Sequence, residues 1–173
     1  MELRQASPPL AASAHESAVP TIALLIPRLY LGVVFGVAVL AKLQAPAGFA
    51  KSLAGFLNGV ALTQGFGWYQ DLVRGFILPH VGLFATLVVL GEACVAVTML
   101  LGLFTRAGAA LAIFLLLNYL SAKGMAPWSP ASNDAADIVL ALTVAWTNAG
   151  RSFGIDGVWN RYARKSRGSR LTA

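Results

Sequence analysis

Four apolar segments of helical length make up most of this chain, and they limit the folds that it can adopt. The first runs over residues 21–43 and the second over residues 79–101. Each is long enough to cross a hydrocarbon layer about 30 Å thick, which takes roughly 20 helical residues. The third (about 107–122) and the fourth (about 135–149) reach that length only with their flanks. The pattern predicts an all-α transmembrane four-helix bundle.

The composition agrees with a membrane protein. Only 12% of the residues are charged and 57% are hydrophobic, whereas soluble domains carry about 25% charged residues. The 13 Lys and Arg residues outnumber the 7 Asp and Glu residues, but most of the cations flank the apolar segments, as in membrane proteins. We therefore expect membrane lipid, and no nucleic acid, as a partner. The single Cys94 excludes a CxxC redox pair.

The segments define the domain organisation and the orientation. Residues 1–20 are small, polar and proline-containing, and are predicted to be a disordered tail. Residues 21–159 form one membrane domain, and residues 160–173 a basic cytoplasmic tail. Four spans place both tails and the turn at Arg106 on one side, with eight cations against four on the other. Because cations favour the cytoplasmic side, we expect both termini in the cytoplasm.

The long connection between the first two segments predicts an extra amphipathic helix. Its apolar residues recur at helical spacing and are Phe49, Leu53, Phe56 and Val60. Lys51 and Asn58 face the other way, which is typical of an interfacial helix. Trp68 and Tyr69 follow, and both residue types favour the lipid headgroup level. Two interpretations stay open: the helix covers the outer mouth of the bundle, or it simply packs on the bundle.

Charged residues inside the apolar segments are the candidate functional residues. A charge near the bilayer centre costs at least about 2.5–3.5 kcal/mol, so partners are expected. Arg28 lies seven residues from the cytoplasmic start of its segment, roughly 10 Å, and Glu92 nine residues from the cytoplasmic end of its own, roughly 13 Å. These similar depths predict an inner Arg28–Glu92 pair.

An outer polar cluster is predicted from the same reasoning. Lys42 and Asp137 both lie near the outer ends of their segments, with Asn118 at a comparable level. Arg28 and Lys42 are fourteen residues apart and project from nearly the same helix face. Two interpretations remain open. The charges either fix helix register only, or they line a pocket for a polar headgroup such as a quinone carbonyl, or relay protons. His15 and His80 are too distant to ligate a haem, and no metal-ligand spacing is present.

The chain resembles the DoxX family of small four-helix membrane proteins. The likeness covers about residues 27–159 and rests on "RLYLGVVFGVAVLAKLQAPAGF", "GEACVAVTMLLGLFTRAGA", "LLLNYLSA", "NDAADIVLAL" and "NAGRSFGID" in this order. The five candidate site residues fall within these motifs. The resemblance implies that the chain is similar to subunits of thiosulfate:quinone oxidoreductase, or to membrane proteins that act as partners of soluble oxidoreductases. It therefore implies an integral inner-membrane subunit of, or anchor for, a quinone-linked oxidoreductase.

The sequence leaves the enzymatic role open. It has no flavin motif, haem ligands or cysteine pair, so no cofactor is expected to be built in; a quinone is the cofactor such a role would use, and an oxidoreductase partner would carry the redox centre. The alternative is a non-catalytic membrane scaffold, or a small-molecule- or lipid-binding protein, with structural charges. A carrier is a third hypothesis. Four short spans without a repeat suit a carrier only as a homo-oligomer.

Overall fold

The computed structural model describes residues 25–45, 48–125 and 133–147, and all secondary structure in these ranges is helical. The expected tails, residues 1–20 and 160–173, lie outside the described residues, as do residues 148 and 149 of the fourth predicted segment. An all-α fold is therefore confirmed for the described ranges.

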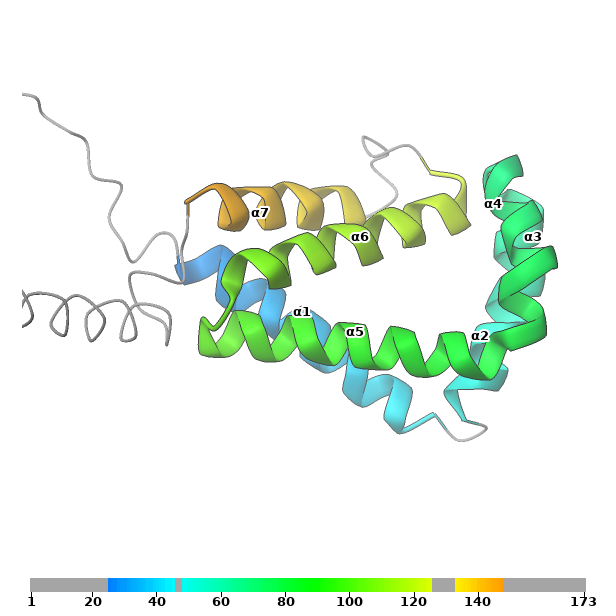
Figure 1. Cartoon of the computed structure of the whole chain (residues 1–173), viewed down its shortest axis with the longest axis horizontal. Helices are drawn as coiled ribbons and strands as arrows, with labels where there is room; N and C mark the ends of the chain where they lie inside the picture. Colours follow the sequence, from blue (N-terminus) through cyan, green and yellow to red (C-terminus); the bar gives the residue numbers. More distant parts are fainter. Residues whose placement is uncertain (1–24, 46–47, 126–132, 148–173) are drawn as a thin grey trace, which may run out of the picture.

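Four helices form the body of the molecule: α1 (Leu25–Leu43), α5 (Val81–Leu101), α6 (Thr105–Lys123) and α7 (Asp134–Thr147). Helix α1 contacts α5 and α7, and α6 contacts the same two helices (Figure 1). Three described helical stretches are long and apolar enough to cross a membrane, at residues 25–43, 67–101 and 105–123. Helix α7 has 14 residues and is shorter than a typical span.

The four helices enclose an apolar core. Its fully buried members include Leu31 from α1, Val95 and Met99 from α5, and Ala112 from α6. Helices α5 and α6 approach closely where a Cβ at Gly108 would overlap the Thr98 side chain. A turn of three residues joins them and begins at Gly102, whose φ of 64° is in the left-handed region that favours glycine. The two helices are therefore held antiparallel at short range.

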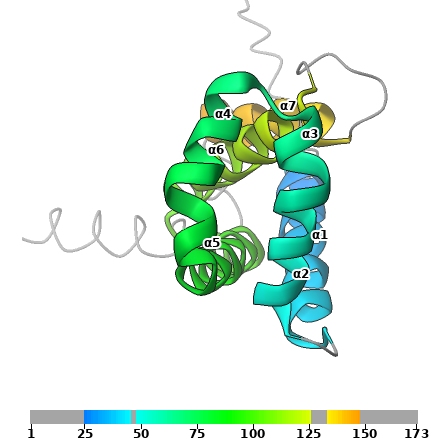
Figure 2. The ribbon, with the colours of Figure 1, turned by 90° about the vertical axis from the view of Figure 1, so that its right-hand side faces the viewer.

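The connection between α1 and α5 is a helical hairpin, residues 49–80, which we call the cap. Its first limb consists of α2 (Phe49–Phe56), the π-helical turn η1 (Leu57–Ala61) and α3 (Leu62–Gln64). Its second limb consists of α4 (Gly67–Leu72), the π-helical turn η2 (Val73–Ile77) and the 3₁₀ turn η3 (Leu78–His80), which leads into α5. Figures 1 and 2 show the cap lying across one end of the body. We call this the cap end.

The predicted amphipathic helix is confirmed in the first limb. Lys51 and Asn58 are exposed, while the apolar residues of the opposite face, Phe49, Leu53, Phe56 and Val60, are half-buried. The second limb was not predicted to be helical. Its Trp68 is 63% exposed, but Tyr69 is only 6% exposed. The Tyr69 ring packs in the core between the limbs, so it faces protein and not lipid.

The tip of the cap docks on the end of α6. The Phe66 N–H donates to the Ser121 carbonyl at 3.1 Å. Gly124 has a φ of 63°, and a Cβ there would overlap the backbone of Gln64. Ala122 belongs to the apolar cluster of the cap. The cap is therefore fastened to α6 and also continuous with α5, which fixes its position over the body.

Candidate functional site

Glu92 lies in the middle of α5, on the face turned toward the other helices. The buried residues of α5 are Ala85, Glu92, Val95, Ala96 and Met99. They recur at helical spacing, so Glu92 occupies a position that the pattern otherwise fills with apolar side chains. It is 2% exposed. A carboxylate at such a position needs compensating partners.

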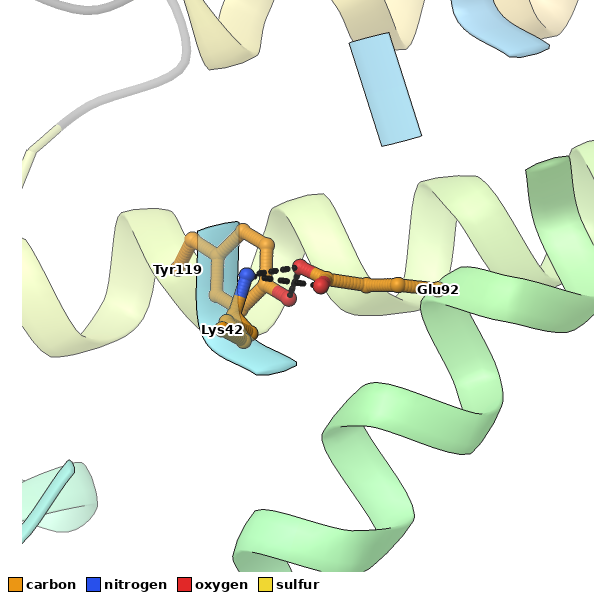
Figure 3. A network of polar contacts seen from close by, with 3 residues as sticks. All are labelled: Lys42, Glu92 and Tyr119. Atoms are coloured by element: carbon orange, nitrogen blue, oxygen red, sulfur yellow. Dashed lines mark hydrogen bonds and ion pairs between the residues drawn. The ribbon is translucent and has the colours of Figure 1, made fainter. Parts of the chain in front are cut away.

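Two side chains from other helices supply these partners. The Lys42 ammonium of α1 contacts both carboxylate oxygens, with Nζ 2.8 Å from Oε1 and 2.6 Å from Oε2. The Tyr119 hydroxyl of α6 donates to Oε1 at 2.5 Å. Figure 3 shows the three side chains converging from α1, α5 and α6. Hydrogen bonds to an ionised group are about twice as strong as neutral ones, so this arrangement compensates the cost of burying the charges.

The cap also contributes to the site. Lys42 belongs to the last turn of α1, and its side chain is 21% exposed. Its ammonium lies 5.4 Å from the centroid of the Phe49 ring. A cation over an aromatic face is attracted by the ring quadrupole. Because Phe49 is the first residue of α2, the beginning of the cap covers the ammonium that binds Glu92.

The predicted Arg28–Glu92 pair was wrong. The carboxylate pairs with Lys42, which is fourteen residues beyond Arg28, or about 21 Å along the helix at 1.5 Å per residue. The depth argument assumed parallel helices of equal extent, whereas α1 runs obliquely across α5 and ends short of its cap end (Figure 1). The shared face was predicted correctly. Arg28 is 3% exposed, and Lys42 also points inward.

The predicted outer cluster does not form either. Asp137 is buried, and its carboxylate lies close to the Tyr30 hydroxyl of α1. Tyr30 lies twelve residues before Lys42, about 18 Å along α1. The Asn118 amide donates to the Phe114 carbonyl of its own helix at 2.7 Å. Of the five predicted residues, Lys42 and Glu92 are joined by a contact between helices, whereas the Asn118 amide bonds within its own helix.

Tyr119 is the site residue that the sequence analysis missed. It follows Asn118 directly, and one residue turns the side chain by about 100° around the helix. A signal for it exists in the sequence. Ala112, Leu115 and Leu116 are buried in α6, and the same spacing continues to Tyr119. A buried tyrosine hydroxyl usually finds a hydrogen-bond acceptor.

A second ion pair lies one helical turn beyond Tyr119, toward the cap end. Lys123 Nζ of α6 is 2.6 Å from Asp134 Oδ2 of α7, and the two side chains are 32% and 15% exposed. Tyr119 and Lys123 are four residues apart and thus share a helix face. At the opposite end of the body, Arg106 Nε donates to the Ala145 carbonyl at 3.2 Å. Polar contacts thus fasten α6 to α7 at two levels.

The site holds three groups with exchangeable protons in an apolar setting: an ammonium, a phenol and a carboxylate. Such a set can donate hydrogen bonds to a ligand carbonyl and can take up or release a proton. Among the described residues, no group of three or more His, Cys, Asp or Glu residues could hold a metal ion. Cys94 is a free, exposed thiol on α5.

The family model described as DoxX matches residues 23–122. The match covers α1, the cap, α5 and nearly all of α6, and it includes Lys42, Glu92 and Tyr119. No curated protein and no solved structure matches the chain.

Proposed function

The chain belongs to the DoxX family, and from this premise we propose that it is an integral bacterial inner-membrane subunit of, or anchor for, a quinone-linked oxidoreductase. The family and the apolar helices identify a membrane protein. The observation that carries the more specific proposal is the Lys42–Glu92–Tyr119 site. Ionisable residues buried within membrane helices are costly and usually functional.

The donor set of the site suits a quinone. A quinone has carbonyl oxygens that accept hydrogen bonds, and its reduction takes up protons as well as electrons. The Lys42 ammonium and the Tyr119 hydroxyl are donors for such an oxygen. Glu92 is the group that binds and releases a proton beside it. These residues therefore bind and orient the carbonyl end of the ligand, and the surrounding apolar helices exclude water from it.

The electrons come from a partner in this proposal. The resemblance to thiosulfate:quinone oxidoreductase subunits favours a soluble or membrane oxidoreductase that carries the redox centre. The chain then contributes the membrane anchor and the quinone site. The exposed face of the cap, which includes Lys51 and Asn58, is the surface that we assign to a soluble partner.

The proposed topology has α7 as a fourth crossing. Helices α1, α5 and α6 cross the membrane, and α7 completes a four-helix bundle as a shorter fourth crossing. The end that carries Arg106 faces the cytoplasm together with both termini, and the cap lies on the outer side. The distribution of Lys and Arg supports this orientation.

The experiment that tests the function is purification from native membranes in mild detergent. Extracted quinone and co-purifying proteins are measured for the natural chain, Tyr119→Phe and Asp137→Asn. Tyr119→Phe keeps the ion pair but removes one donor, and Asp137→Asn alters a buried carboxylate outside the site. We expect stoichiometric quinone with the natural chain and Asp137→Asn, and at least tenfold less with Tyr119→Phe. A natural chain that carries no quinone, alone or with its partner, would contradict the proposal.

A second candidate function follows from the contacts that the site residues already make with one another. Both carboxylate oxygens of Glu92 already contact the Lys42 ammonium, so the charges are compensated without a ligand. This favours a non-catalytic membrane scaffold, or a lipid-binding protein, in which the pair fixes how α1 and α5 pack. The same purification separates the two functions, because a scaffold carries neither quinone nor a redox partner.

A further inference from the structure

Glu92 lies at a boundary between a polar and an apolar part of the body. Toward the cap end, its neighbours are the ionisable side chains of Lys42 and Tyr119 and, beyond them, Lys123 and Asp134. Toward the opposite end, the next buried residues of α5 are Val95, Ala96 and Met99. Groups that can bind or release a proton therefore lie next to Glu92 on the cap side, whereas the neighbouring buried residues of α5 on the other side are apolar.

On the cap side, the exposed fraction of the polar side chains increases with distance from Glu92. Glu92 is 2% exposed and accepts a hydrogen bond from Tyr119. Tyr119 lies within electrostatic range of Asp134 in α7 and Tyr69 in the cap. Asp134 pairs with Lys123, and these two side chains are 15% and 32% exposed. A hydroxyl between a buried carboxylate and a solvent-accessible ion pair is suited to pass a proton between them.

The core that α1, α5 and α6 share on the other side of Glu92 is apolar, although Arg28, Thr105 and Asp137 are also buried in the body. Val95 and Met99 have no exposed surface, and the side chains packed at this level from α1 and α6, those of Leu31, Ala109 and Ala112, have none either. From Glu92 to the end of α5 at Leu101 is nine residues, or about 13 Å. A close-packed apolar interior holds no chain of water molecules, because water enters only where polar groups bind it.

We propose that Glu92 exchanges its proton only with the aqueous phase at the cap end, through the Tyr119 hydroxyl and the Lys123–Asp134 pair. In this route the Tyr119 O–H proton passes to the Glu92 carboxylate, and the phenolic oxygen receives a proton from a hydronium ion at the ion pair, which becomes water. The net change is one proton moved from the cap-side aqueous phase to Glu92. The inference deepens the proposed function, on which its consequence rests: a quinone reduced at this site draws its protons from the cap side.

Charged and titratable side chains lie on the elements packed around Glu92. They are Arg28 and Lys42 of α1, Tyr119 and Lys123 of α6, Asp134 and Asp137 of α7, and Tyr69 of α4. A measurement in one uniform solution cannot separate their influence from the route. The test must therefore set different pH values at the two ends of the body.

The experiment uses the full chain in sealed lipid vesicles with a pH difference across the membrane. A hydrophobic carbodiimide modifies protonated carboxyl groups within apolar surroundings, and peptide mass spectrometry measures its rate at Glu92. Molecules with the cap outward are selected through Asn58→Cys, at an exposed cap position, in a Cys94→Ser background, with a membrane-impermeant maleimide. Glu92→Gln identifies the labelled site, and Asp137→Asn controls for the other buried carboxyl.

We expect the labelling rate to rise about tenfold for each unit by which the cap-side pH falls, and to stay constant when only the pH on the other side is changed. A rate that follows the other side, or both sides equally, would overturn the proposal. So would the absence of labelling at every pH, because such a carboxylate takes up no proton. No quinone is needed, so a chain that fails to bind quinone can still pass this test.

Discussion

The Lys42 ammonium hydrogen-bonds both carboxylate oxygens of Glu92, with Nζ–O distances of 2.6 and 2.8 Å, although fifty residues separate the two in sequence. The contact ties the last turn of α1 to the middle of α5. It also brings together a cation that is 21% exposed and an anion that is 2% exposed. The carboxylate of the pair is therefore buried in the apolar interior, and the ammonium is partly exposed beside Phe49 of the cap.

Removing one partner of this pair is expected to destabilise the protein strongly. Glu92→Gln leaves the Lys42 ammonium without its counter-charge, and breaking a buried ion pair costs about 3–5 kcal/mol. The measurement is thermal unfolding in detergent. The double variant Glu92→Gln with Lys42→Met should recover most of the loss, because neither charge then remains. Asp71→Asn, at an exposed carboxylate, should be neutral. A double variant less stable than Glu92→Gln would contradict the pairing.

Tyr119→Phe is expected to weaken the protein through the same site. The substitution removes a hydrogen bond to a charged group, worth about 1.5–3 kcal/mol. The check is a double-mutant cycle with Glu92→Gln in the same unfolding assay. The coupling energy should be at least about 0.5 kcal/mol, since contacting residues are not additive. Purely additive effects would mean that the hydroxyl does not act on the carboxylate.

Gly124→Ala is expected to loosen the cap. The residue has a φ of 63°, and a Cβ would overlap the backbone of Gln64, so the cap tip must move away from α6. We expect faster hydrogen–deuterium exchange over residues 57–66 and a loss of at least about 1 kcal/mol. Gly55→Ala is the matched control, because a Cβ at Gly55 meets open space. It should leave the exchange unchanged and stabilise α2 by about 0.5–1 kcal/mol. Equal effects of the two substitutions would contradict the docking contact.

Gly108→Ala is expected to push α5 and α6 apart. The added methyl would overlap the Thr98 side chain, and overpacking of this kind costs about 1–3 kcal/mol. Gly82→Ala on the exposed side of α5 meets no atom within 4 Å and serves as the control. Thermal unfolding of both variants decides the matter. The prediction fails if Gly108→Ala is as stable as Gly82→Ala.

The sequence by itself determined the helices and their inward faces. Apolar length and periodicity are local properties, so they located α1, α5, α6, α7 and the first cap limb within a few residues. They also placed Arg28, Lys42, Glu92 and Asp137 on faces turned toward the body. A charge in an apolar run has to be compensated, so the existence of a buried polar site also followed from the sequence.

Only the tertiary structure decided which residues meet. The partner of Glu92 depends on the angle at which α1 crosses α5 and on where α1 ends, and neither is encoded in the periodicity of a single segment. One residue of helix rotation selects Tyr119 over Asn118. The second cap limb was not predicted from the sequence, because its helical structure depends on packing against the first limb. Helix formation is governed by neighbours along the chain, whereas contacts between helices depend on crossing angles that the whole set of packed side chains determines together.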